Sequence, residues 1–271
     1  MQNWKLTLTY DGTNYHGWQV QPGLLTIQGE LQSALQRILG ESPLPQGSGR
    51  TDAGVHALGQ VASLALDAPI PADNLQRALN RTLPAAIRVL QAEQVMDSFH
   101  ARHSAMAKTY EYRIFRGRLC SPFLAPYVHH CLWPLDSAAL DQSARDVVGE
   151  HDFASLAASD PDSTERSSDP DVEERSTTRT IFSSKWTEAP GDLLIYRVRG
   201  NGFLHHMVRN LVGTMLEIAR GQFPAGSMPG ILEARARSAA GPTAPARGLF
   251  LHSVEYSTDL GREGISAVLL P

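Results

Sequence analysis

The sequence has little cysteine and no long hydrophobic run. Its 271 residues contain two cysteines, Cys120 and Cys131, too few for a four-ligand zinc cluster. We expect two buried thiols in a reducing cytoplasm, and a single disulfide is the alternative. No stretch reaches the roughly 20 apolar residues of a membrane span, and the first residues lead into a strand pattern without a signal peptide. These absences predict a globular, cytoplasmic protein with no membrane partner.

Several motifs that would indicate a metal or a nucleotide cofactor are missing too. The sequence has no P-loop, no Gly-x-Ser-x-Gly elbow, no Gly-rich dinucleotide fingerprint, no His-Glu-x-x-His and no Cys-x-x-Cys. Histidines do occur close together, at 129–130, 205–206, and 100 with 103. Adjacent residues of a strand or helix point in different directions, which makes them poor chelators. We therefore predict no metal site, and we expect His205 and His206 to pack near a helix start.

The charge is weakly acidic, with a formal net charge of −4. Residues 159–174 hold seven acidic residues against Arg166 alone, so the rest of the chain is net positive. This stretch is rich in serine and nearly free of apolar residues, which indicates an acidic insertion at about 158–177. Its charge would repel phosphate, so we expect it to lie away from any bound nucleic acid.

The hydrophobic pattern predicts an α+β protein of two domains, 1–105 and 106–271. Strands are indicated by period-two alternation and helices by apolar residues on one face. Thr26 is placed to cap a helix that Gly40 ends. The expected strands cover 5–10, 61–66, a stretch from 87, 107–114, a stretch from 179, 193–198 and a last strand that follows 249 and runs through 254 and 256. The expected helices cover 27–39, 71–79, 137–148 and a stretch that follows 201–210.

The stretch from Gly49 to Gln60 gathers glycines, an arginine and one carboxylate. It predicts a turn that presents Asp52, with Arg50 beside it. A guanidinium near a carboxylate favours its ionised form, which suits a nucleophile. For an isolated Arg-x-Asp, the alternative that Asp52 only caps backbone amides would be preferred.

The most basic stretch runs from residue 102 to 118. It holds five basic residues against Glu111 alone, with Tyr110 and Tyr112 on one face of an expected strand. Basic residues interleaved with aromatic residues are typical of nucleic-acid surfaces. A solvated strand face over two core tyrosines explains the pattern equally well. The basic residues are Arg102, Lys108, Arg113, Arg116 and Arg118.

Five stretches in this order resemble the TruA family of tRNA pseudouridine synthases, and together they span nearly the whole chain. They are 10–19, with Tyr-Asp-Gly and Tyr-x-Gly-Trp-Gln, 49–60, with Gly-Arg-Thr-Asp-Ala-Gly-Val-His, and 99–112, 205–210 and 243–249. The resemblance implies the pseudouridine synthase fold. That fold has two similar α/β subdomains with mainly antiparallel sheets flanked by helices, and an active-site cleft between them.

The resemblance also assigns roles to single residues. It implies that Asp52 is the nucleophile, that Tyr110 lies against the target base and that Arg209 pairs with Asp52. Arg50 is expected to bind RNA and to help hold a flipped-out nucleotide. Further RNA contacts are expected from Arg102, Lys108, His56 and Gln60.

The implied reaction is the isomerisation of uridine to pseudouridine at positions 38, 39 and 40 of the tRNA anticodon stem-loop, by a homodimer and without a cofactor. Attack of Asp52 on ribose C1′ and addition to uracil C6 both fit the sequence. Two other classes of function also stay open from the residues alone. One is an RNA-binding protein without chemistry, and the other is a metal-dependent hydrolase.

Overall fold

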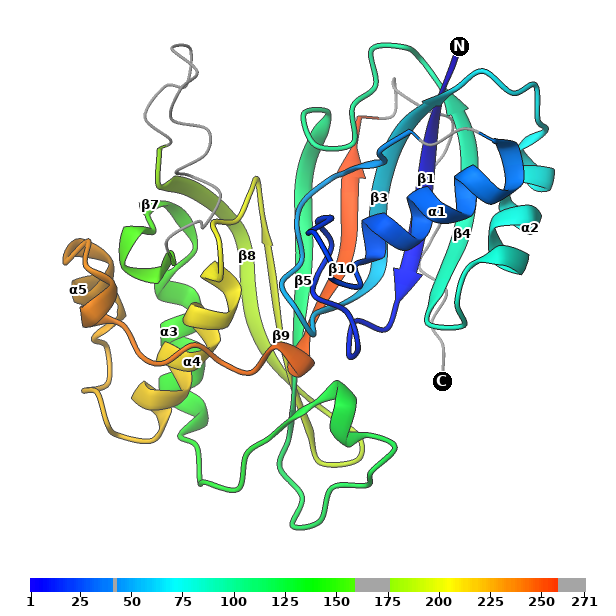
Figure 1. The fold of residues 1–271 in the computed structure, drawn as a ribbon. Helices are drawn as coiled ribbons and strands as arrows, with labels where there is room; N and C mark the ends of the chain where they lie inside the picture. Colours follow the sequence, from blue (N-terminus) through cyan, green and yellow to red (C-terminus); the bar gives the residue numbers. More distant parts are fainter. Residues whose placement is uncertain (41–42, 159–175, 258–271) are drawn as a thin grey trace. The chain divides into compact units, whose positions relative to one another are not determined.

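The computed structural model describes residues 1–40, 43–158 and 176–257 (Figure 1). By their internal contacts these residues form two compact units. Unit 1 comprises Met1–Ala107 and the chain from Leu251 on, and unit 2 comprises Lys108–Phe250. Almost all of the predicted acidic insertion lies outside the described residues. The domain limits predicted from the sequence stay a prediction.

Unit 1 is a sheet with two helices. Its strands follow the order β4-β1-β3-β10, and β2 pairs with β3. The pairs β1–β3, β1–β4 and β2–β3 are antiparallel, and α2 packs on β4 and on α1. The elements are β1 (Gln2–Tyr10), α1 (Ile27–Leu39), β2 (Gln46–Gly47), β3 (His56–Leu66), α2 (Ala72–Thr82), β4 (Ile87–Val95) and β10 (Leu249–Tyr256).

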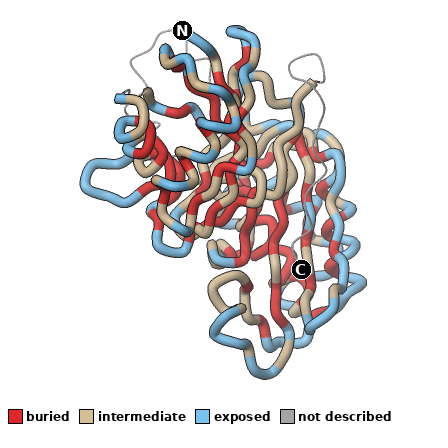
Figure 2. Tube along the Cα trace, turned by 90° about the vertical axis from the view of Figure 1, so that its right-hand side faces the viewer, coloured by how far each residue is buried: buried red, intermediate tan, exposed pale blue. Residues whose placement is uncertain are grey.

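The core of unit 1 follows the predicted pattern. Alternate β1 side chains, Leu6, Leu8 and Tyr10 among them, are buried, and Figure 2 marks the buried residues in red. Burying a side chain of this size stabilises a fold by about 1.5–3 kcal/mol. The predicted limits of α1 are confirmed, because the Thr26 side chain accepts a hydrogen bond from the Gly29 amide and Gly40 ends the helix at φ 72°.

In the described ranges, unit 2 contains five further strands and its own helices. The strands follow the order β5-β9-β8-β7 and are antiparallel, while the short β6 is parallel to β5. The longer elements are β5 (Ala105–Phe115), β6 (His129–His130), α3 (Ser137–Asp146), β7 (Gly149–Asp152), β8 (Thr178–Ala189), β9 (Leu193–Gly200), α4 (Met207–Ala219) and α5 (Met228–Glu233). Short 3₁₀ turns are η1 (Ala125–Tyr127), η2 (Ala154–Leu156), η4 (Arg237–Ala239) and η5 (Ala246–Gly248).

Helix α4 is buried on almost every side. All of its residues except Arg209 and Glu217 are buried. Gly213 is required where the chain crosses the helix, because an added Cβ would lie 1.7 Å from the Pro242 carbonyl oxygen. The predicted apolar stripe therefore marks only part of the buried surface of this helix.

The sequence predicted the class of fold correctly, a mostly antiparallel α+β architecture with flanking helices. The predicted start of strand β3 was wrong. This strand begins at His56 rather than at Val61, because the polar side chains of His56 and Gln60 are buried and hydrogen-bonded. Polar residues at these positions indicated a loop in the sequence. No helix in the described ranges is long and apolar enough to cross a membrane.

Candidate active site

The loop between β2 and β3 presents Asp52 on a tight turn. The Val55 amide donates a hydrogen bond to the Asp52 carbonyl oxygen at 3.1 Å. Gly54 occupies the third position of this turn with φ 77°, a value that glycine adopts without strain. Asp52 is half-buried. The turn thus places a carboxylate at the loop tip, as the glycine-rich motif predicted.

A hydrogen-bond network lies beneath this loop. The Tyr10 and Thr51 hydroxyl groups are 2.8 Å apart. The Gln60 amide nitrogen donates to the Gly49 carbonyl at 3.0 Å and to the Tyr10 hydroxyl at 3.4 Å, and its oxygen accepts from the Ser48 hydroxyl at 2.7 Å. Burial raises the pKa of Tyr10 to about 12 against the opposing effect of these bonds, so the hydroxyl stays protonated. Gln60 therefore supports the loop from below.

His56 anchors the C-terminal end of the Asp52 loop, where β3 begins. Its ring is buried, and Nδ1 accepts a hydrogen bond from the Gly12 amide at 3.1 Å. Nδ1 also lies 3.2 Å from an Asp11 carboxylate oxygen. Both contacts of Nδ1 hold the ring at the start of β3.

The predicted RNA contacts of unit 1 differ in position. Arg102 is exposed and Arg50 is half-buried. The positions of these two side chains are therefore compatible with an RNA contact. His56 and Gln60 are buried, and their positions give no support to a direct RNA contact. The ion pair expected between Arg50 and Asp52 stays a prediction.

Tyr110 comes from β5 and lies in unit 2. It pairs with Val198 in the β5–β9 register, and its ring meets the Phe203 ring edge to face with centroids 5.0 Å apart. Such a contact stabilises one ring orientation. Lys108, the first residue of unit 2, is half-buried. Phe203, which the sequence did not single out, thus fixes the predicted base-stacking tyrosine.

Arg209 lies in the first turn of α4. Its Nε–H donates to the Ala244 carbonyl at 2.8 Å, and the Ala244 amide donates to the Arg209 carbonyl at 3.1 Å. This reciprocal pair fixes the guanidinium against the segment at 243–245. Burial raises the pKa of Tyr112, and the positive charges of Arg209 and Arg247 oppose that rise. The two family-like motifs at 205–210 and 243–249 therefore meet in unit 2.

The residue after Arg209 joins these motifs to the core. The buried Asn210 donates from Nδ2 to the Leu156 carbonyl at 2.8 Å, and its Oδ1 accepts from the Thr243 hydroxyl at 2.7 Å and from Arg237 at 3.2 Å. A buried amide with all these bonds stabilises one arrangement of its partners. In the sequence, the only signal for this structural role of Asn210 is its position at the end of the motif at 205–210.

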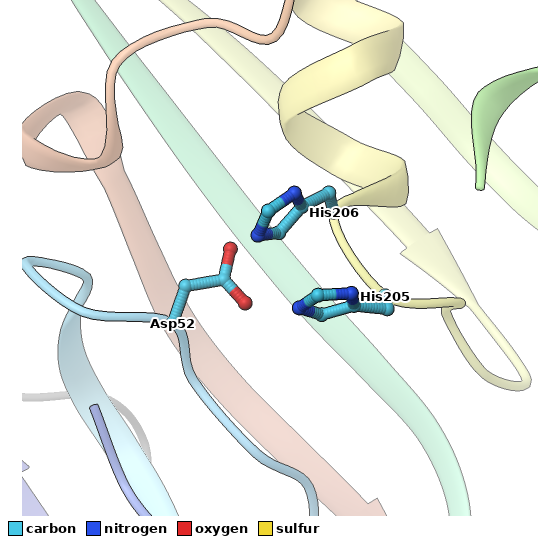
Figure 3. A group of neighbouring side chains, drawn as sticks. All are labelled: Asp52, His205 and His206. Carbon is cyan, nitrogen blue, oxygen red and sulfur yellow. The ribbon is translucent and has the colours of Figure 1, made fainter. Parts of the chain in front are cut away.

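The histidine pair before α4 departs from the sequence-based expectation. The His205 and His206 ring centroids lie 3.9 Å apart, with the ring planes tilted by 34°, although neighbouring side chains were expected to point in different directions. His206 adopts the left-handed region at φ 58°, which changes the direction of successive side chains. The prediction that the pair packs at a helix start is confirmed. Figure 3 draws this pair, from the segment before α4, and Asp52, from the loop before β3.

The chain belongs to the tRNA pseudouridine synthase family, whose model it matches over residues 7–104 and 143–257. Members of this family are isomerases that convert uridine to pseudouridine in tRNA. The resemblance read from the five sequence stretches is therefore confirmed.

The relatives with the family's more specific name cover the chain almost end to end. The tRNA pseudouridine synthase A of Solibacter usitatus is 53% identical over 257 residues, which is 94% of this chain and 100% of that protein. The enzyme of the same name from Moorella thermoacetica is 44% identical over 93% of this chain and 98% of its own length. The enzyme of the same name from Lacticaseibacillus casei is 42% identical over 94% of this chain and 100% of its own length.

Solved structures add little to this assignment. A crystal structure of a Cbf5-Nop10-Gar1 complex matches 90% of this chain and 56% of its own chain at 14% identity, with a TM-score of 0.32. A score this low carries no argument about this protein.

Proposed function

We propose that this chain converts uridine to pseudouridine at positions 38, 39 and 40 of the tRNA anticodon stem-loop, with Asp52 as its nucleophile. The observation that carries the proposal is the placement of Asp52 on a glycine turn whose flanks are tied to the core. In the reaction the N1–C1′ bond breaks and a C5–C1′ bond forms. The C5 proton is lost, and N1 gains a proton. Atoms and electrons balance without an oxidant, a reductant or a cofactor.

Tyr110 and Arg209 serve the same uridine in this proposal. A uridine stacked in a stem is out of reach and has to flip out, at a cost of roughly a few kcal/mol. Stacking on Tyr110 returns roughly 1–3 kcal/mol. Arg209 pairs with Asp52 and favours its ionised, nucleophilic form. The edge-to-face contact of Tyr110 with Phe203 and the bond from Arg209 to Ala244 support these roles, because both hold the side chains in one orientation.

The remaining charges contact the RNA backbone. Arg50, Arg102 and Lys108 supply positive charge to phosphates, and recognition rests on shape and backbone more than on base edges. His56 and Gln60 support the Asp52 loop. The enzyme works as a homodimer in the cytoplasm, where its tRNA substrate is found.

The substitution Asp52→Asn tests the proposal. It keeps the size of the side chain and removes its nucleophilic charge. We expect binding of an anticodon stem-loop RNA within threefold of wild type and a loss of pseudouridine formation of at least about 1,000-fold. Asp67→Asn, at an exposed aspartate of the same unit, is the control and keeps full activity. Normal product formation by Asp52→Asn would refute the role of Asp52 while leaving the family assignment intact.

A further inference from the structure

The segment from Gly12 to Trp18 lies directly against the backbone of the Asp52 loop. Gly17 has φ 85°, and a Cβ added there would lie 2.5 Å from the Thr51 carbonyl oxygen and 3.1 Å from the Asp52 carbonyl carbon. Real Cβ atoms essentially never approach another heavy atom within 3.0 Å, and both of these neighbours are backbone atoms. Only glycine fits at this position without moving the loop.

Gly12 makes a second close approach, on the other side of the turn. A Cβ at Gly12 would lie 2.0 Å from the Val55 carbonyl oxygen and 2.7 Å from the Val55 carbonyl carbon. The backbone of Gly12 is not left-handed, so its requirement for glycine is one of space alone. The two glycines bring one segment into contact with both flanks of Asp52.

Hydrogen bonds fix this contact on both sides of Asp52. The Trp18 amide donates to the Thr51 carbonyl at 3.0 Å, and the Gly54 amide donates to the Tyr15 carbonyl at 3.2 Å. The segment is itself anchored, because the amides at the start of α1 donate to it. Ile27 bonds to the Gly17 carbonyl at 3.2 Å and Gln28 bonds to the Trp18 carbonyl at 3.0 Å. Residues 12–18 therefore connect a rigid helix start to the loop that carries the carboxylate.

We infer that Gly12 and Gly17 are positioning residues, which set the place of the Asp52 carboxylate by letting residues 12–18 pack on the backbone of residues 51–55. This inference rests on the proposed role of Asp52. It assigns to the motif at residues 10–19 the role of positioning the Asp52 loop. A carboxylate displaced by about 1 Å loses on the order of 100-fold in rate, because the reacting atoms leave their attack geometry. Binding of tRNA over its wide surface is little affected by such a shift.

The pair Gly17→Ala and Gly23→Ala tests the inference. Gly23 has φ 72°, close to that of Gly17, but nothing lies within 4 Å of an added Cβ. Both substitutions therefore carry the same left-handed backbone strain, and only Gly17→Ala pushes on the loop. We expect Gly17→Ala to lower kcat between tenfold and 100-fold with the Kd for tRNA within threefold of wild type. Gly23→Ala should keep kcat within twofold.

Gly12→Ala adds the steric clash without the left-handed strain and should also lower kcat at unchanged Kd. Wild-type kcat in both Gly17→Ala and Gly12→Ala would overturn the inference, as would an equal loss in Gly23→Ala. Hydrogen exchange of the wild-type protein gives a test that needs no variant. We expect the Trp18 and Gly54 amides to exchange at least tenfold more slowly than the Gly23 amide, and equal rates would also overturn the inference.

The outcomes separate the positioning role from the nucleophile assignment on which it rests. If Asp52→Asn stays active while Gly17→Ala loses kcat and the two amides are protected, the contact positions the loop and the proposed role of Asp52 as nucleophile is wrong. If Asp52→Asn is inactive while Gly17→Ala behaves like Gly23→Ala, the proposed function stands and the positioning role fails.

Discussion

Replacing Glu111 by glutamine should destabilise unit 2 measurably. The Glu111 side chain is only 3% exposed, and its two oxygens accept hydrogen bonds from Arg113 Nε and Arg197 Nε, each at 2.7 Å. It lies on β5 between Tyr110 and Tyr112. Glutamine has the same shape but offers one accepting oxygen, so one arginine would face an N–H group instead of a carboxylate.

The size of the effect follows from the exposure of the partners. Breaking a fully buried ion pair costs about 3–5 kcal/mol. The Arg113 and Arg197 side chains are 29% and 56% exposed, and solvent screening reduces the cost. We expect Glu111→Gln to lower the free energy of unfolding by about 2 kcal/mol, or the melting temperature by about 4–8 °C. Urea denaturation at pH 7 measures this directly.

The pH dependence provides a second check on Glu111. Burial alone raises its pKa, but the hydrogen bonds and charges of Arg113 and Arg197 outweigh burial and lower the pKa below its ordinary value of 4.5. A carboxyl group with a lower pKa in the folded state contributes its full stability above the unfolded pKa and loses it as pH falls through the folded pKa. The difference between wild type and Glu111→Gln should be constant from pH 8 to 5 and should shrink below pH 4.5.

The matched control is Glu188→Gln, because Glu188 is 78% exposed on β8, which pairs with β9, and lies 3.5 Å from Arg116. It should change stability by less than about 0.5 kcal/mol. A double-mutant cycle of Glu111→Gln with Arg197→Ala should show coupling. Equal effects of the two glutamate substitutions, or a difference that grows as pH falls from 8 to 5, would refute the reasoning.

Two further predictions concern buried hydrogen bonds. Asn210→Ala should lower the free energy of unfolding by about 2–4 kcal/mol, because the buried Leu156 carbonyl and the half-buried Thr243 hydroxyl lose their partner. A urea midpoint equal to that of wild type would contradict this. Tyr10→Phe should cost about 1 kcal/mol, since the buried bond to Thr51 is lost. The loss of stability should be the same at pH 7 and pH 9, because the pKa of Tyr10 is about 12. A loss that disappears by pH 9 would show that the Tyr10 hydroxyl is not protonated in this range.

The sequence predicted those features that depend on neighbouring residues. Thr26 and Gly40 mark the ends of α1 because capping and left-handed termination are local chemistry. The alternation from Leu6 to Tyr10 predicted the core face of β1 for the same reason. The tip of the Asp52 turn followed from its glycines.

Features that join distant parts of the chain could not be predicted in this way. The start of β3 at His56 depends on a bond from Gly12, 44 residues earlier. The close contact of the His205 and His206 rings depends on a left-handed backbone at a residue other than glycine. The contact of Phe203 with Tyr110 joins two separate segments. A single sequence gives no period or spacing that reports such contacts.

Mass-spectrometric mapping of pseudouridine in an unmodified anticodon stem-loop tRNA transcript tests the central claim most directly. After incubation with the wild-type protein, the account predicts pseudouridine where uridine stood at positions 38, 39 and 40, and none after incubation with Asp52→Asn. The same yield from both proteins, or modification outside these positions alone, would contradict it.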